Sequence, residues 1–196
     1  MKKVLLLLAN GFEAYEASVF TDVFGWNLYE GDGTTELVSA GLHPVLHCTW
    51  GYDCIPHFQL SEIELSDFDA LAIPGGFEEA GFYEDAYSTQ FLDVIRYFNN
   101  RHKPIAAICV GSLAVARSGA LHQRLGTTYY YPSSPRQAQM EELGVIVQPE
   151  ERIVQDDNII TSSSPETALD VAFSLLEILT DSKNVQQVKN RMGFKG

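Results

Sequence analysis

Continuous apolar runs alternate along the chain with stretches in which apolar residues recur every three or four positions. An unbroken run is typical of a strand buried on both faces of a parallel sheet, and the longer spacing is typical of a helix that turns one face to the core. The runs predict strands at 4–9, 36–40, 44–49, 69–73 and 104–108, weaker strands at 125–130 and 145–147, and a hairpin of 153–155 with 159–161. The periodic stretches predict helices from 14 to the glycine-rich turn at 31–33, and at 86–100, 112–120, 136–143 and 167–179.

This order of elements predicts the fold. Strands that alternate with helices are joined by right-handed crossovers into a mostly parallel, doubly wound α/β sheet. The chain has 196 residues, 45% of them hydrophobic, so we expect a single domain over residues 1–196. Ligands of such sheets bind where strands end. Candidate chemistry therefore belongs in 10–16, 74–79 and 109–112, which follow the most apolar strands.

Charge and cysteine content narrow the function. Acidic residues outnumber basic ones, 26 against 13, and the net charge of -13 repels phosphate backbones and anionic lipid headgroups. We therefore expect no nucleic-acid and no membrane partner. The first apolar run is interrupted at Gly11 and Glu13, too early for a signal peptide. The chain has three cysteines and no CxxC pair, which argues against a secreted disulfide framework and favours the cytoplasm. Cys48 and Cys54 are interpreted as packing or surface thiols.

Cys109 directly follows the apolar strand at 104–108 and directly precedes a predicted helix. This setting is typical of a nucleophile elbow, in which small residues two before and two after the nucleophile let strand and helix approach each other. Ala107 and Gly111 meet that need. A helix N-terminus favours a thiolate, so the sequence predicts a low pKa for Cys109; the alternative is a buried structural cysteine.

Glu16 lies one helical turn after the end of the first strand, where its carboxyl group could reach the thiol. A partly buried glutamate can stay protonated and donate a hydrogen bond to a thiolate, or act as acid and base. Glu13 is the competing candidate, and its alternative role is to stabilise the helix N-terminus. Gly75 and Gly76 are either a plain tight turn or, with Ser112 nearby, part of a set of amides that holds an oxyanion.

Four motifs stand in order along nearly the whole chain. They are Leu-Leu-Ala-Asn-Gly-Phe-Glu-Ala-Tyr-Glu at 7–16, Ile-Pro-Gly-Gly at 73–76, Ala-Ala-Ile-Cys-Val-Gly at 106–111 and Ile-Ile-Thr-Ser-Ser-Ser-Pro at 159–165. Together they resemble the ThiJ/PfpI family, the family of the parkinsonism-associated deglycase, within the class I glutamine amidotransferase-like superfamily. The resemblance implies a flavodoxin-like sandwich and a homodimer.

The resemblance also implies a role for each motif. By this likeness Cys109 is the family's reactive cysteine, and Glu16 is the glutamate that hydrogen-bonds it. Gly75, Gly76 and the Val110 amide correspond to the oxyanion donors.

The chain departs from the family where a histidine often accompanies the cysteine. The position after the cysteine is Val110, and the segment that reads Thr-Thr-His-Pro in the family reads Thr-Thr-Tyr-Tyr-Tyr-Pro at 127–132. Tyr129 is the candidate for the histidine's place, and with Ser112, which replaces a common proline, it is a candidate for the substrate pocket. The histidines of this chain are interpreted as surface or loop residues: His43, His47, His57, His102 and His122.

These residues predict a cytoplasmic enzyme that acts on small reactive carbonyls in a glyoxalase- or deglycase-like reaction. Cys109 would add to an aldehyde and Glu16 would move the proton, without a metal or organic cofactor. The alternative is a non-enzymatic redox sensor or chaperone-like stress protein, in which Cys109 is oxidised to sulfenic or sulfinic acid. A hydrolase or peptidase is the third hypothesis, weakened by the missing histidine. Without a base near pKa 7, we expect slow turnover.

Overall fold

The computed structural model describes residues 1–194, and a seven-stranded sheet forms their centre. Its strands are β1 (Lys2–Leu8), β2 (Thr35–Gly41), β5 (Phe58–Gln59), β6 (Ala70–Ile73), β7 (Ile105–Ala107), β10 (Ile153–Asp156) and β11 (Ile159–Ser162). Their order across the sheet is β10-β11-β7-β6-β1-β2-β5. Every neighbouring pair is parallel except β10 with β11, which form the predicted hairpin at the edge. The predicted mostly parallel, flavodoxin-like α/β fold is confirmed.

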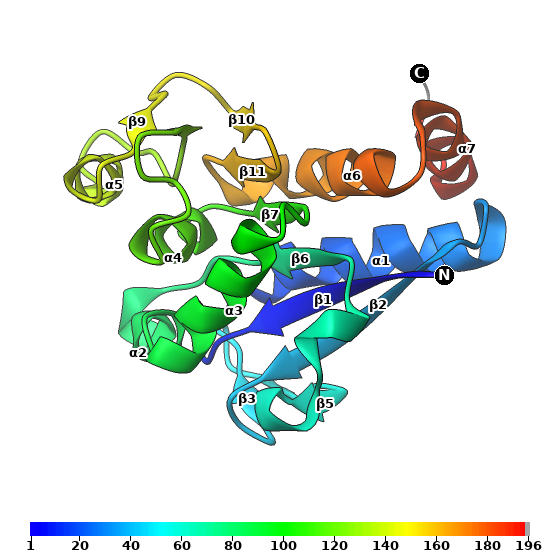
Figure 1. The fold of residues 1–196 in the computed structure, drawn as a ribbon, viewed down its shortest axis with the longest axis horizontal. Coiled ribbons are helices and arrows are strands. Elements are labelled where there is room, and N and C mark those ends of the chain that lie inside the picture. Colours follow the sequence, from blue (N-terminus) through cyan, green and yellow to red (C-terminus); the bar gives the residue numbers. More distant parts are fainter. Residues whose placement is uncertain (195–196) are drawn as a thin grey trace.

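Helices cover both faces of this sheet (Figure 1). Three of them pack against one another on one face: α1 (Ala14–Glu30), α6 (Ala168–Leu179) and α7 (Ser182–Met192). The others are α2 (Phe82–Ala86), α3 (Thr89–Asn100), α4 (Gly111–Arg117) and α5 (Arg136–Glu142). Short 3₁₀ turns span Leu60–Glu62, Leu65–Asp67, Glu78–Ala80 and Pro165–Thr167. Figure 1 shows the N-terminus and α7 at one end of the molecule and α5 at the opposite end.

The position of β1 follows from its composition. Val4 to Leu8 are all buried because β2 and β6 flank the strand and helices cover the sheet. Burying one such side chain stabilises the fold by roughly 1.5–3 kcal/mol, so an unbroken apolar run is most stable in the middle of the sheet. The chain leaves β1 at Ala9 and enters α1 at Ala14, which places the 10–13 turn at the carboxyl edge of the sheet.

Two of the predicted strands are shorter and lie outside the main sheet. Within 44–49 only β3 (Leu46–His47) is extended, and it pairs with β4 (Asp53–Cys54) in a small antiparallel sheet. Within 125–130 only β8 (Leu125–Gly126) forms, parallel to β9 (Ile146–Val147). The apolar pattern overstated their burial, since Val45, Leu125 and Tyr130 are exposed, and it carried no information about which strand they would pair with.

Two helices also differ from the prediction. The predicted helix at 86–100 is interrupted at Ser88, whose hydroxyl accepts a hydrogen bond from the Phe91 N–H at 3.3 Å and starts a new helix. The helix α7 was missed because it is mostly polar and buries only Asn184, Val185 and Val188. None of the helices in residues 1–194 is both long enough and apolar enough to cross a membrane.

Candidate active site

Cys109 lies in a sharp turn between β7 and α4. Its φ is 54°, in the left-handed region that residues with a side chain rarely adopt. A Cβ atom on Gly111 would lie 2.8 Å from the Pro74 carbonyl oxygen, so only glycine permits this approach of helix and strand. Ala107 is fully buried beneath the turn. The predicted elbow geometry is therefore present, and it holds the Cys109 side chain at the carboxyl edge of the sheet.

Glu16 is fully buried on the first turn of α1. The Gly75 N–H donates a hydrogen bond to its Oε2 at 2.5 Å. Its carboxyl group is also coupled electrostatically to the Cys109 thiol. Within residues 1–194 Oε1 has no regular hydrogen-bond partner, which leaves this oxygen free for the thiol. The structure thus brings together the two residues that the sequence had proposed as a pair.

Burial dominates the acidity of this pair. It raises the pKa of Glu16 to about 8, although the Gly75 N–H acts in the opposite direction. Burial also raises the pKa of the Cys109 thiol well above its usual range, a charged Glu16 raises it further, and the Val110 N–H lowers it. The predicted low pKa of Cys109 is wrong, because the helix N-terminus acts on a sulfur that is only 5% exposed. The two groups are coupled, and Glu16, whose pKa is about 8, loses its proton before the thiol does.

The three amides predicted as oxyanion donors differ in availability. The Gly75 N–H is engaged by Glu16, so its predicted role as an oxyanion donor is wrong for this geometry. A Cβ atom on Gly75 would lie 2.9 Å from Glu16 Oε2, which explains the glycine. The Gly76 N–H has no acceptor among the residues that the structure describes. The Val110 N–H interacts with Cys109 itself. Of the three amides, only Gly76 is therefore without an acceptor among the described residues, and the Val110 N–H already faces the sulfur.

A cavity of about 190 Å³ opens above Cys109. Tyr129 lies in its wall and is half-buried, as the sequence had suggested. The suggestion was wrong for Ser112, which is fully buried outside the wall with its hydroxyl 3.4 Å from the Ala107 carbonyl oxygen. The lining residues are Glu13, Gly76, Phe77, Glu78, Glu79, Cys109, Val110, Tyr129, Ser134, Pro135, Arg136 and Pro165.

Sequence reasoning missed the ion pair in this wall. Arg136, at the start of α5, donates from Nη2 to Glu78 Oε2 at 2.7 Å. The residues are 58 positions apart, and no motif links them. A cation next to a predicted helix start was the only available signal, and it does not distinguish a pocket residue from a surface residue.

Histidines are absent from the lining of this cavity. His43 contacts Asp85, His47 contacts Asp53, and the His57 ring lies 2.7 Å from the Ser39 hydroxyl. The interpretation that no histidine serves as the base is therefore consistent with the geometry. Glu16 is the buried acid–base group beside the sulfur.

Comparisons with known proteins agree with this arrangement. The model of the DJ-1/PfpI family matches residues 2–178. Protein DJ-1alpha of Drosophila melanogaster is 30% identical over 195 residues, which cover 97% of this chain and 83% of that protein. Deglycase PfpI of Pyrococcus furiosus is 28% identical over 129 residues, or 65% of this chain and 72% of that one. The crystal structure of DJ-1beta from Drosophila melanogaster matches with a TM-score of 0.85 at 26% identity, covering 100% of this chain and 99% of that chain.

Proposed function

Because this chain belongs to the DJ-1/PfpI family, we propose that it transforms small reactive carbonyl compounds through Cys109, in a glyoxalase- or deglycase-like reaction. One observation carries the proposal: Cys109 lies at a cavity of about 190 Å³ and interacts with the buried carboxyl group of Glu16. The name of the similar Pyrococcus furiosus protein, a deglycase, supports the same class of reaction.

Glu16 and the amides near Cys109 account for the successive steps of the proposed reaction. Sulfur adds to the carbonyl carbon while Glu16 takes the thiol proton and passes it to the carbonyl oxygen, which becomes the hydroxyl of a hemithioacetal. The Gly76 and Val110 amides are the donors that stabilise negative charge on that oxygen. With an α-oxo aldehyde, Glu16 can then move the proton from the former aldehyde carbon to its neighbour, while the hydroxyl proton passes to the neighbouring oxygen, and the product is a 2-hydroxy thioester. Water hydrolyses the resulting thioester to a 2-hydroxy acid and frees the thiol.

Consumption of methylglyoxal by the purified protein tests this proposal. We expect Cys109→Ser to lower kcat/KM on the order of 10³-fold or more, because the nucleophile is lost. Cys54→Ser removes a free thiol outside the cavity and is the matched control. Wild-type activity should rise with pH toward 8, where the Cys109 and Glu16 pair loses its first proton. Absence of turnover, or equal loss in both variants, would contradict the proposal.

A redox sensor is the second candidate, and the same amides favour it. Oxidation of a thiol to sulfinic acid creates an anion, and the unpaired Gly76 N–H together with Val110 could bind its oxygens. This candidate predicts that peroxide adds two oxygen atoms to Cys109 in a protein that consumes no methylglyoxal. Mass spectrometry of the peptide that contains Cys109 measures the addition. A hydrolase or peptidase lacks a histidine in the described cavity and is less well supported.

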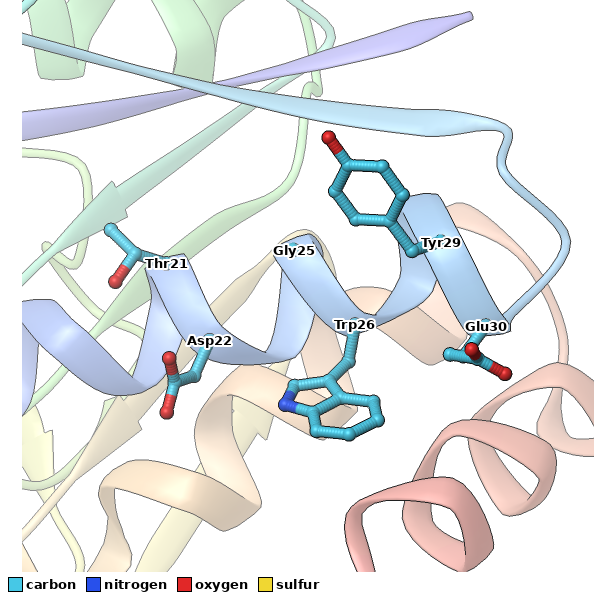
Figure 2. A pocket seen from close by; sticks show the side chains of 6 residues that line it. All are labelled: Thr21, Asp22, Gly25, Trp26, Tyr29 and Glu30. Atoms are coloured by element: carbon cyan, nitrogen blue, oxygen red, sulfur yellow. The ribbon is translucent and has the colours of Figure 1, made fainter.

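We also propose a homodimer, as the family resemblance implies. Large apolar side chains are exposed on α1, with Tyr29 84% and Trp26 39% exposed. Figure 2 shows Tyr29 and Trp26 projecting from opposite sides of the helix, and a Cβ atom on Gly25 would have no atom of residues 1–194 within 4 Å. Light scattering at micromolar concentration should give twice the chain mass of 21.8 kDa, and Trp26→Arg should lower it. A monomeric wild type would overturn this proposal.

We further propose the cytoplasm as the compartment. All three cysteines are free thiols, which suits a reducing environment. Fractionation of cells that make the protein tests this assignment.

A further inference from the structure

The cavity above Cys109 has an uneven set of charges. Three carboxylates, Glu13, Glu78 and Glu79, and one cation, Arg136, line it. Charges so close to a small ligand change its affinity strongly, because part of the surrounding water is replaced by protein. The balance between these groups therefore decides which ligands enter.

Arg136 is already occupied by contacts within the protein. Its Nη2 bonds Glu78 at 2.7 Å, its Nη1 bonds Gln139 Oε1 at 3.0 Å, and its guanidinium carbon lies 5.0 Å from the centre of the Tyr83 ring. The side chain is only 17% exposed. Arg136 and Glu78 thus cancel each other as charges, and the cation is held in the wall rather than presented to a ligand.

Glu13 and Glu79 have no such compensation. Neither carboxylate forms an ion pair or a side-chain hydrogen bond among the residues that the structure describes. Glu13 is half-buried at the start of α1, and its backbone N–H is fixed by the Gly75 carbonyl at 2.8 Å. The net charge of the chain, -13, adds a field of the same sign.

We propose that the cavity selects ligands by charge. Glu13 and Glu79 exclude carbonyl compounds that carry a carboxylate or a phosphate, and they favour neutral or cationic ones. The carbonyl part of this inference rests on the proposed function, whereas the charge selection concerns the cavity itself. The opposite assignment, in which Arg136 anchors an anionic substrate, would place that anion next to the Glu78 carboxylate.

Alkylation of Cys109 measures this selection without any turnover. Iodoacetamide and iodoacetate have nearly the same size, but only the second is an anion. Their rates at Cys109 are followed by peptide mass spectrometry at pH 8, which favours the charged form of Glu13, and each is divided by its rate with 2-mercaptoethanol. We expect the normalised rate of iodoacetate to be about tenfold or more below that of iodoacetamide. The difference should shrink in 0.5 M NaCl because salt screens the carboxylates.

A second pair of reagents extends the test to cations. The trimethylammonioethyl and sulfonatoethyl methanethiosulfonates have similar bulk and opposite charge. We expect the cationic reagent to modify Cys109 faster than the anionic one. The ratio of these two rates should exceed the ratio of the iodoacetamide rate to the iodoacetate rate, because the two reagents differ by two charges instead of one. Equal normalised rates in both reagent pairs would overturn the proposal.

Substitutions of the charged residues test which side chains cause the charge selection at Cys109. Glu13→Gln and Glu79→Gln together should raise the normalised ratio of iodoacetate to iodoacetamide several-fold, whereas Glu177→Gln, an exposed charge on α6, should not change it. Arg136→Gln should exclude iodoacetate further. If Arg136 binds anions instead, wild type prefers iodoacetate and Arg136→Gln loses that preference, which contradicts the proposal.

The outcome separates this inference from the proposed function. Charge selection without methylglyoxal turnover would sustain the electrostatic assignment and contradict the enzyme. Turnover with methylglyoxal and the anionic α-oxo aldehyde 4,5-dioxopentanoate used equally well would sustain the enzyme and contradict the charge selection.

Discussion

Buried polar side chains are fully hydrogen-bonded at one end of the central sheet and partly unpaired at the other end. At the amino end of β1 and β2, four side chains from α1, β2, α7 and the turn between α1 and β2 form a closed hydrogen-bond network. Asn27 donates to Thr35 at 2.8 Å and to Asp32 at 3.1 Å, and Asn184 donates to Asn27 at 2.6 Å and accepts from the Asp32 N–H at 2.8 Å. None of these side chains has a buried polar atom without a partner in residues 1–194.

At the carboxyl end, buried polar atoms lack partners. Within residues 1–194 these are Glu16 Oε1, Tyr83 Oη, Thr127 Oγ1 and Ser162 Oγ. Glu16 interacts with Cys109, Ser162 ends β11, and the Tyr83 ring lies under the Arg136 guanidinium of the cavity wall. An unsatisfied buried polar group costs roughly 1–3 kcal/mol.

This difference indicates which end of the sheet serves stability and which end serves reactivity. A satisfied network fixes α7 to α1 and serves stability, whereas the unpaired oxygen of Glu16 beside the nucleophile remains free to exchange a proton. Disturbing each end should therefore change a different property of the protein.

The largest effect should come from replacing Glu16 with Gln and measuring stability against pH. The folded protein raises the pKa of Glu16 from 4.5 to about 8, so it favours the protonated carboxyl group. Wild-type stability should fall as pH rises from about 4.5 to 8, by up to about 5 kcal/mol. Glu16→Gln cannot lose a proton and should lack this fall. Urea denaturation at pH 5 and pH 8 checks it, and parallel pH profiles for the two proteins would contradict it.

The same variant should also lose activity. Glutamine keeps the shape of the side chain but cannot move a proton, and a positioned acid or base contributes about 10²–10⁴-fold. We expect kcat for methylglyoxal to fall by that factor, while near-ultraviolet circular dichroism stays unchanged. Indifference of kcat to this substitution would mean that another group, such as Glu13, supplies the base.

At the opposite end, Asn184→Ala should lower stability and leave the chemistry intact. The substitution leaves the side-chain oxygen of Asn27, Oδ1, and the backbone N–H of Asp32 without their partners. We expect a loss of about 2–4 kcal/mol in urea denaturation. Asn190→Ala, on the exposed side of the same helix, should change stability by less than about 0.5 kcal/mol. A similar small change for Asn184→Ala would show that the network contributes little.

The smallest effect should come from Tyr129→Phe. Tyrosine has a pKa near 10 and cannot act as a base at neutral pH, so its hydroxyl can at most donate one hydrogen bond to a bound substrate. We expect kcat/KM for methylglyoxal to change by less than about tenfold, far less than in Glu16→Gln. A larger loss for Tyr129→Phe than for Glu16→Gln would reverse the roles assigned to the two side chains.

The sequence by itself determined the parts that depend on local chemistry. The apolar runs predicted the central parallel strands because only a doubly covered strand buries every side chain. The elbow at Cys109 was predictable because small residues at 107 and 111 are what a strained turn between strand and helix needs. Glu16 could be placed beside the thiol because the carboxyl ends of parallel strands share one edge.

Only the tertiary structure decided the rest, because it depends on contacts between distant segments. The Gly75 N–H proved to be engaged by Glu16, 59 positions away, and the Arg136 and Glu78 pair spans 58 positions. The direction in which the pKa of Cys109 shifts could also not be predicted from the neighbouring residues in the sequence. A helix N-terminus can be seen in the sequence, but the desolvation that outweighs it comes from the surrounding fold. The helix α7 is mostly polar and buries only Val185 and Val188 besides Asn184, which bonds Asn27 and Asp32, so its short apolar pattern was not recognised as a helix.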